Sequence, residues 1–286
     1  MEFRKSALLF VALVFLGASN LLAQEQAEAP KYGWENTILG NLNFSQSSFS
    51  NWAQGGENNW AWQLDLNGKF ENKQEKYDWT TNAKVSYGRT KVGDQQSKKS
   101  ADEIRMESVL TWKAGKTVHP YIAFTGETQL TKGYDFSTDP KTVISQFLDP
   151  GYFTESIGLG FEPFKDCKTR FGAALKQTVA NDFASRYSDD PATTDIEKVR
   201  SEVGIESVSD FSRKVSENIL FTTKLELFSD LSTFEEVDVR WDNVFSAKVS
   251  KYIGVSFNFK LLYDRDISLS RQIKQVLGVG LSYTFL

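Results

Sequence analysis

Residues 59–70 read Asn59-Trp60-Ala61-Trp62-Gln63-Leu64-Asp65-Leu66-Asn67-Gly68-Lys69-Phe70, and two kinds of side chain alternate along them. The even positions carry Trp, Trp, Leu, Leu, Gly and Phe, whereas the odd positions carry Asn, Ala, Gln, Asp, Asn and Lys. Because successive side chains of a β-strand point to opposite faces, this period of two predicts a strand with one apolar and one polar face.

The same alternation recurs in about twelve segments, which is the pattern of a transmembrane antiparallel up-and-down β-barrel. We predict strands near 36–46, 58–71, 77–91, 102–113, 118–132, 151–162, 169–180, 197–210, 216–229, 237–250, 252–264 and 271–286. Short connections are expected at 72–76, 114–117, 163–168, 211–215 and 251. The others are mostly longer, above all 132–150 and 181–196. Short turns on one side place both termini of the barrel, residues 35–286, in the periplasm.

Aromatic residues gather at both ends of these segments. Those near the short turns are Trp34, Tyr77, Trp79, Trp112, Tyr121, Phe161 and Tyr252. Those near the opposite ends are Trp60, Trp62, Tyr87, Phe153, Trp241 and Tyr263. Two belts are what amphipathic rings prefer at two water–lipid interfaces, which favours a membrane barrel over the alternative, a soluble barrel or sandwich.

The N-terminal residues resemble a secretory signal peptide. Arg4 and Lys5 precede the apolar run 7–16, and Ala23 offers a small residue for cleavage. The run is shorter than the roughly twenty residues that a transmembrane helix needs, which argues against the alternative of an uncleaved anchor. We therefore predict a signal peptide over residues 1–23 and a polar periplasmic lead-in over 24–34.

The last eight residues, 279–286, alternate to the end of the chain. They resemble the C-terminal signal by which the assembly machinery of bacterial outer membranes recognises its clients, although Leu286 follows the aromatic Phe285 on which such signals usually end. This resemblance implies residence in the outer membrane of a Gram-negative bacterium. The expected partners are the assembly machinery and outer-membrane lipid. The alternative interpretation of residues 279–286 is an ordinary last strand of a soluble sandwich.

Composition excludes several classes of function. The net charge of −4 comes without basic runs, so no nucleic-acid partner is expected. Cys167 is the single cysteine, which rules out an internal disulfide and a multi-cysteine metal site. His119 is the single histidine, and no nucleophile or orienting group is expected beside it. We predict no catalytic residue, metal or cofactor. The alternative function is that of a lipid-modifying outer-membrane enzyme, with His119 as its candidate catalytic residue.

The segment 43–58 (NFSQSSFSNWAQGGEN) resembles the NxSQxSxSNWAxGGEN signature of a Bacteroidota outer-membrane β-barrel family catalogued as a domain of unknown function. Residues 144–152 (ISQFLDPGY) are similar to the ISxFLxPxY segment of that family. The resemblance implies an integral outer-membrane barrel and no assigned activity.

The first segment contains a loop motif with a physical interpretation of its own. Gly55 and Gly56 favour positive φ and turn the chain into the next strand. Ser50 and Asn51 suit capping of local backbone groups, and Trp52 is large enough to pack into the barrel mouth. With Glu57, these residues form either a folded hairpin tip or a loop that narrows the lumen or contacts a ligand or partner.

Charged residues fall on the inner faces of the predicted strands. The lumen candidates are Arg105, Glu107, Lys176, Arg200, Glu202, Lys224, Glu226 and Arg240; further inward charges are Lys260, Lys274, Asp65, Glu127, Asp238 and Asp242. Their balanced signs favour cross-strand ion pairs that fill the interior, with a narrow conducting pore as the alternative. We therefore expect a non-catalytic barrel with one of two roles. It is either a structural or partner-binding component, with a membrane protein as partner, or a narrow passage for small polar solutes.

Overall fold

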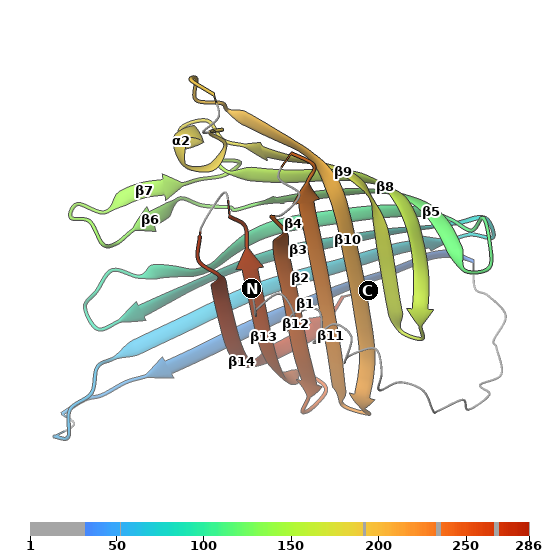
Figure 1. The fold of residues 1–286 in the computed structure, drawn as a ribbon. Coiled ribbons are helices and arrows are strands. Elements are labelled where there is room, and N and C mark those ends of the chain that lie inside the picture. Colours follow the sequence, from blue (N-terminus) through green and yellow to red (C-terminus); the bar gives the residue numbers. More distant parts are fainter. Residues whose placement is uncertain (1–31, 52, 191–192, 233–235, 266–268, 286) are drawn as a thin grey trace, which may run out of the picture. The chain divides into compact units, whose positions relative to one another are not determined.

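The computed structural model describes residues 32–51, 53–190, 193–232, 236–265 and 269–285. Twelve antiparallel strands close into one barrel in the order β1-β14-β13-β12-β11-β10-β9-β8-β5-β4-β3-β2 (Figure 1). Each barrel strand pairs with the next barrel strand along the chain, β5 with β8 included, and β1 meets β14 to close the ring. The predicted twelve-stranded antiparallel barrel is thereby confirmed.

The elements keep to the predicted segments to within a few residues. The barrel strands are β1 (Gly33–Ser47), β2 (Asn59–Lys73), β3 (Tyr77–Val92), β4 (Lys98–Trp112), β5 (Val118–Thr128), β8 (Gly151–Phe164), β9 (Cys167–Val179), β10 (Val199–Ser216), β11 (Ile219–Asp230), β12 (Asp238–Lys248), β13 (Ile253–Tyr263) and β14 (Gln272–Thr284). Two long connections carry further elements, namely the hairpin β6 (Gly133–Asp135) and β7 (Thr142–Ser145), and the single-turn helix α2 (Ala184–Tyr187). Neither was predicted.

Two of the shifted boundaries change the predicted division of the chain. Strand β1 begins at Gly33, so the last residues of the predicted lead-in 24–34 already belong to the barrel; residues 1–31, including the predicted signal peptide, lie outside the described residues. The predicted turn at 211–215 is wrong, because β10 continues to Ser216. Phe211 explains the extension, since its ring packs against Phe221 on adjacent β11 and against Phe164 at the end of β8, with centroids 6.2 and 6.0 Å apart.

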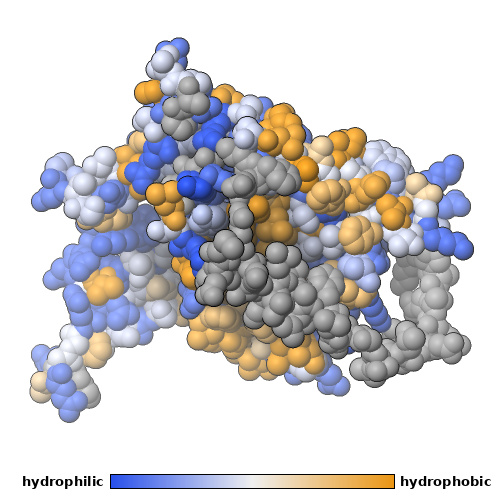
Figure 2. Space-filling view, in the orientation of Figure 1, coloured by the Kyte–Doolittle hydropathy of each residue, from blue (hydrophilic) through white to orange (hydrophobic). Residues whose placement is uncertain are grey.

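The outer face of the barrel is apolar over its middle. Exposed hydrophobic side chains follow every second position of the strands, as in Ile157, Leu159 and Phe161 on β8, and orange patches cover much of the visible barrel surface in Figure 2. An apolar outer band of this kind is what a barrel needs where it contacts lipid. No helix among the described residues is long and apolar enough to span a membrane.

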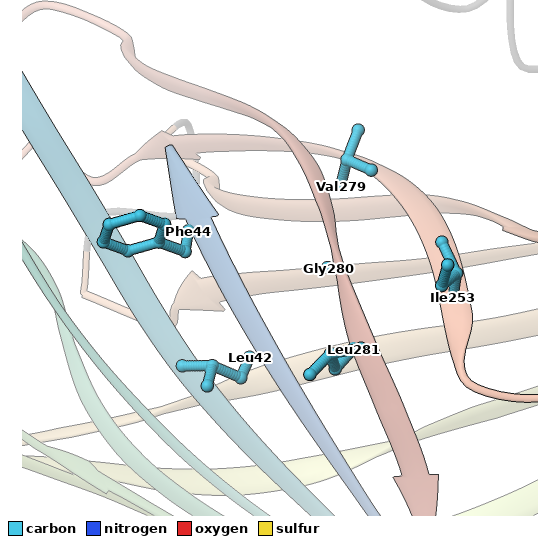
Figure 3. Close-up of a pocket in the computed structure, with 6 residues that line it drawn as sticks. All are labelled: Leu42, Phe44, Ile253, Val279, Gly280 and Leu281. Carbon is cyan, nitrogen blue, oxygen red and sulfur yellow. The ribbon is translucent and has the colours of Figure 1, made fainter. Parts of the chain in front are cut away.

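Strands β1 and β14 form the shortest ladder of the barrel. Five residue pairs join them, from Leu39 with Thr284 to Asn43 with Gly280, whereas β1 and β2 share fifteen. On the outer face this seam carries a shallow apolar groove, which Figure 3 shows lined by Leu42, Phe44, Ile253, Val279, Gly280 and Leu281. Position 280 accommodates only glycine, because a Cβ there would lie 2.2 Å from the carbonyl oxygen of Leu42.

Candidate functional site

Ion pairs cross the lumen between strands that are not neighbours in the sheet. The guanidinium of Arg105 on β4 donates to Glu127 Oε2 on adjacent β5 at 2.6 Å. It also donates to Glu226 Oε1 at 2.6 Å, although Glu226 lies on β11, five strands away around the ring. Arg105 therefore ties opposite walls together.

A second crossing joins β4 to β12 and β13. Glu103 on β4 accepts from Arg240 at 2.9 Å and from Lys260 at 3.1 Å, both from the far wall. Arg240 also pairs with Glu127 on β5 and with Asp242 on its own strand. The middle of the lumen is thus occupied by charged side chains in mutual contact.

A third group fills the lumen nearer to the short turns. Glu107 on β4 accepts from Arg170 on β9 at 2.7 Å and from Lys224 on β11. Arg170 also donates to Glu206 at 3.2 Å, and Glu206 accepts the hydroxyl of Ser156 at 2.6 Å. Pairing and hydrogen bonding of this kind offset the desolvation cost of buried charges, so the group forms a packed polar core.

A row of glycines lets the wall close tightly beside this core. Tyr121, Gly158 and Gly172 stand opposite one another on β5, β8 and β9, and Tyr121 is 1% exposed on the inner face. A Cβ on Gly158 would lie 2.2 Å from the carbonyl oxygen of Phe171, and one on Gly172 would lie 2.7 Å from the Tyr121 hydroxyl. The prediction that Tyr121 belongs to an outer aromatic belt is therefore wrong, because its ring covers the glycines inside.

Near the long-loop end, Lys176 forms a separate cluster. Its ammonium lies 2.6 Å from Asp238, 2.9 Å from Asp264 and 3.6 Å from Glu202. Arg200 lies 3.9 Å from the other oxygen of Glu202. With these contacts, the structure places all eight lumen candidates on the inner face and in ion pairs.

The opposite part of the wall is open to solvent. On β9 and β10 most inward residues are buried, and Arg170 and Glu206 side chains are 10% and 9% exposed. On β1, by contrast, none of the inward residues from Gly33 to Ser47 is buried. Lys69 on β2 is 54% exposed and Lys84 on β3 is 38% exposed, although both face inward. The lumen therefore has a packed wall and a hydrated wall.

Short uncharged polar side chains line much of the hydrated wall, between charged residues and glycines. Those on β13, β14, β1 and β2 include Ser256, Asn258, Ser282, Asn41, Asn43, Ser45, Gln63 and Asn67. Such side chains hydrogen-bond water without filling the space in front of them. Beside the ion pairs, this side of the inner face is therefore polar and partly exposed.

The loop motif forms the tip between β1 and β2. Gly55 and Gly56 have φ of 81° and 142°, values that glycine tolerates, and Asn51 has φ of 54°. Phe49 packs on Gly56, and its N–H donates to the side chain of Asn58 at 2.6 Å.

Other motif residues lie at the exposed tip or beside the next loop. Ser50 and Asn51 are exposed, and Trp52 lies outside the described residues. Glu57 lies against Gly93 between β3 and β4, where a Cβ would be 1.7 Å from its carboxylate. The motif thus connects two neighbouring loops.

The second motif, 144–152, fastens the two longest loops together. Asp149 is 3% exposed and accepts the N–H groups of Asn181 and Asp182 at 2.9 and 2.8 Å. Leu148 N–H donates to Thr128 at the end of β5. One carboxylate therefore holds the start of the α2 loop, which the sequence pattern did not reveal.

Replacing Asp149 with asparagine should loosen that loop. The substitution removes charge-assisted bonds to two backbone N–H groups, each worth about 1.5–3 kcal/mol. Limited proteolysis with trypsin should then cut faster at Arg186 in α2. The matched control is Asp195→Asn, an exposed carboxyl in the same loop; equal cleavage rates of the two variants would contradict the anchoring role of Asp149.

His119 lies in β5 on the inner face, two residues before Tyr121. Its Nδ1 is buried and has no hydrogen-bond partner among the described residues. A general base needs a nucleophile and an orienting group within hydrogen-bond reach, and the described residues supply neither at this nitrogen.

Several residues of the packed wall escaped the sequence prediction. They are Glu103, Tyr121, Ser156, Arg170 and Glu206. Strand parity alone places each of them inward, so that signal was available. Which of them meet across the lumen depends on closure and tilt of the barrel, which periodicity does not contain.

Comparison with known proteins finds other barrels at low similarity. The translocator domain of the autotransporter NalP from Neisseria meningitidis is 9% identical with a TM-score of 0.39, covering 99% of this chain and 95% of its own. The NanC porin is 10% identical with a TM-score of 0.40, covering 86% and 98%. An outer membrane channel from Pseudomonas putida F1 is 8% identical with a TM-score of 0.41, covering 92% and 99%. These likenesses support no inference about function.

No curated protein matches the chain in sequence. Residues 44–134, which run from β1 to β6, match a family model. They begin one residue inside the segment whose resemblance predicted a family without assigned activity. That prediction is confirmed: this part of the chain matches the family described as "Protein of unknown function (DUF3078)".

Proposed function

We propose that the protein is a non-catalytic outer-membrane barrel that gives small polar solutes a narrow passage along its hydrated wall. The observation that carries this proposal is the unequal burial of the two walls of the lumen. Ion pairs hold β4 and β5 to β11, β12 and β13, while none of the inward residues of the fifteen-residue strand β1 is buried. At about 3.3 Å per residue, a strand of that length is long enough to cross a bilayer.

The same geometry limits the size of the solute. Twelve strands enclose a modest lumen, and the ion-paired side chains take up part of its cross-section. Water and small polar molecules fit a path lined by serine, asparagine and glutamine, whereas a wide aqueous pore would need the centre to be empty. On the outside, the exposed apolar side chains, seen as orange patches in Figure 2, suit contact with outer-membrane lipid.

Planar-bilayer recording tests the passage. The purified full-length protein should give small conductance steps, and liposomes that contain it should swell in small sugars but not in large oligosaccharides. Asn41→Trp, which fills the hydrated wall, should reduce the conductance. The matched control Leu42→Trp places the same ring on the lipid face of the same strand and should leave the conductance unchanged.

Each outcome bears on the proposal. Absence of conductance and swelling with correctly folded protein would overturn the passage and favour a purely structural barrel. Equal effects of Asn41→Trp and Leu42→Trp would show that the current does not follow the β1 wall.

A further inference from the structure

The ladder between β1 and β14 ends before either strand does. Its last pair is Asn43 with Gly280, whereas β1 continues for four more residues and β14 starts eight residues earlier. Continued in register, residues 44–47 would pair with residues 276–279, yet no ladder pair joins these two described stretches. Both stretches remain strands, because β2 and β13 pair with them from behind. The seam is therefore open over four residues of each strand, or about 13 Å by the rise of a β-strand.

The side chains on the outer face show where the two strands separate. Figure 3 shows Leu42 and Leu281 close together across the paired part of the seam, with Phe44 and Val279 farther apart beyond it. The opening therefore begins immediately after the last pair, on the side of the long loops.

The opening lies at the level of the aromatic residues near the long loops. On one side of it Phe44 pairs with Trp62 on β2, and on the other side Leu277 pairs with Phe257 on β13. Aromatic girdles mark the water–lipid interface of a membrane barrel, so the opening faces the outer leaflet. Unpaired strand edges at membrane depth are tolerated where they line a water-filled space, because water then satisfies their N–H and C=O groups. Water from the hydrated wall therefore reaches this opening.

The rim of the opening is apolar towards the lipid and polar towards the lumen. On the lipid side Phe44, Leu277 and Val279 are exposed, and Leu277 is 72% exposed. On the lumen side lie Asn43 and Ser45, whose side chains hydrogen-bond polar groups. The apolar groove of Figure 3 continues from this rim along the outer face. A molecule in the opening thus has apolar surroundings at one end and polar surroundings at the other.

We propose that the opening between β1 and β14 is a lateral portal, through which small single-chain amphiphiles pass between the outer leaflet and the lumen. The alkyl chain lies in the apolar groove beside Leu42 and Leu281, and the polar group reaches the hydrated wall at Ser45. The shallow groove suits one alkyl chain rather than the two or more of a membrane lipid. The opening itself does not depend on the proposed function, whereas the onward route through the lumen rests on it.

Cysteine labelling tests whether water reaches the opening. The full-length protein first receives Cys167→Ser, which removes its single native thiol. In liposomes, Leu277→Cys should then react severalfold faster than Phe257→Cys with a membrane-impermeant maleimide, because the reactive thiolate forms where water reaches the sulfur. Phe257→Cys is the matched control, since Phe257 lies directly opposite Leu277 on the lipid face, within the closed part of the wall.

Octyl glucoside below its micelle concentration tests the class of ligand, with glucose as the matched compound that lacks the alkyl chain. Octyl glucoside should slow the labelling of Leu277→Cys by occupying the opening, whereas glucose should leave the rate unchanged. Labelling that octyl glucoside does not slow would overturn the assignment of amphiphiles.

The remaining outcomes separate this inference from the proposed function. Equal labelling of Leu277→Cys and Phe257→Cys would overturn the portal and leave the passage intact. Labelling in liposomes that is lost in native outer membranes would show that another protein covers the seam, which would also overturn the portal. Absence of conductance while Leu277→Cys is still labelled would instead overturn the proposed function and the onward route through the lumen.

Discussion

Glu107→Gln should destabilise the barrel by about 3 kcal/mol, because one partner of a buried ion pair is removed while the other charges remain buried. Glu107 is 4% exposed and lies between the Arg170 guanidinium at 2.7 Å and the Lys224 ammonium. Asp210 and Glu226, at 3.5 and 3.6 Å from Lys224, compensate only in part. Urea unfolding in lipid vesicles, followed by tryptophan fluorescence, measures the loss.

The control is Glu162→Gln, which breaks an exposed pair with Lys168 at 3.9 Å and should cost less than about 1 kcal/mol. Glu107→Gln combined with Lys224→Gln also removes one of the two cations that Glu107 neutralises, and should recover part of the stability. If Glu107→Gln were as mild as Glu162→Gln, the packed wall would be hydrated rather than closed.

Gly158→Ala should be still more damaging, at more than about 3 kcal/mol, since overpacking against backbone leaves no side chain free to move aside. The added Cβ would lie 2.2 Å from the Phe171 carbonyl oxygen and 2.5 Å from Gly172 Cα. Strands β8 and β9 would have to separate locally. Heat-modifiable migration on a gel, followed by urea unfolding, reports whether the barrel still closes.

Gly160 provides the matched control on the same strand and face. A Cβ there would lie 3.6 Å from the His119 carbonyl oxygen, an ordinary contact. Gly160→Ala should therefore be neutral or slightly stabilising, because glycine within a strand costs about 0.5–1 kcal/mol relative to alanine. Equal behaviour of Gly158→Ala and Gly160→Ala would contradict the close approach of β8 to β9.

The periodicity of the strands predicted most of the fold. Ile104 and Met106 against Arg105 and Glu107 give the two faces of β4 directly, because a strand has only two sides. Connections were harder to predict: Asp149 holds the α2 loop through backbone N–H groups 32 and 33 residues away, and such contacts leave no periodic trace. Residue composition likewise gave no sign of the hairpin β6–β7.

The candidate site was predictable as a set of residues and not as an arrangement. Balanced inward charge favoured pairs between neighbouring strands, whereas Arg105 and Glu226 meet across the lumen from β4 and β11. A one-dimensional pattern contains neither the closure of the ring nor the strand tilt that brings these two together. The division into a packed and a hydrated wall follows from those pairings, so it too was absent from the sequence prediction.

The five residue pairs between β1 and β14 also bear on how the barrel assembles and where it opens first. This ladder joins the two ends of the chain, so its formation carries the largest loss of chain entropy and is repaid by the fewest backbone hydrogen bonds. The other ladders join barrel strands that follow one another along the chain, so they can form through local contacts. We therefore expect an open twelve-stranded sheet to precede the closed ring, and the ring to part first between Leu42 and Leu281 when the molecule is pulled or heated.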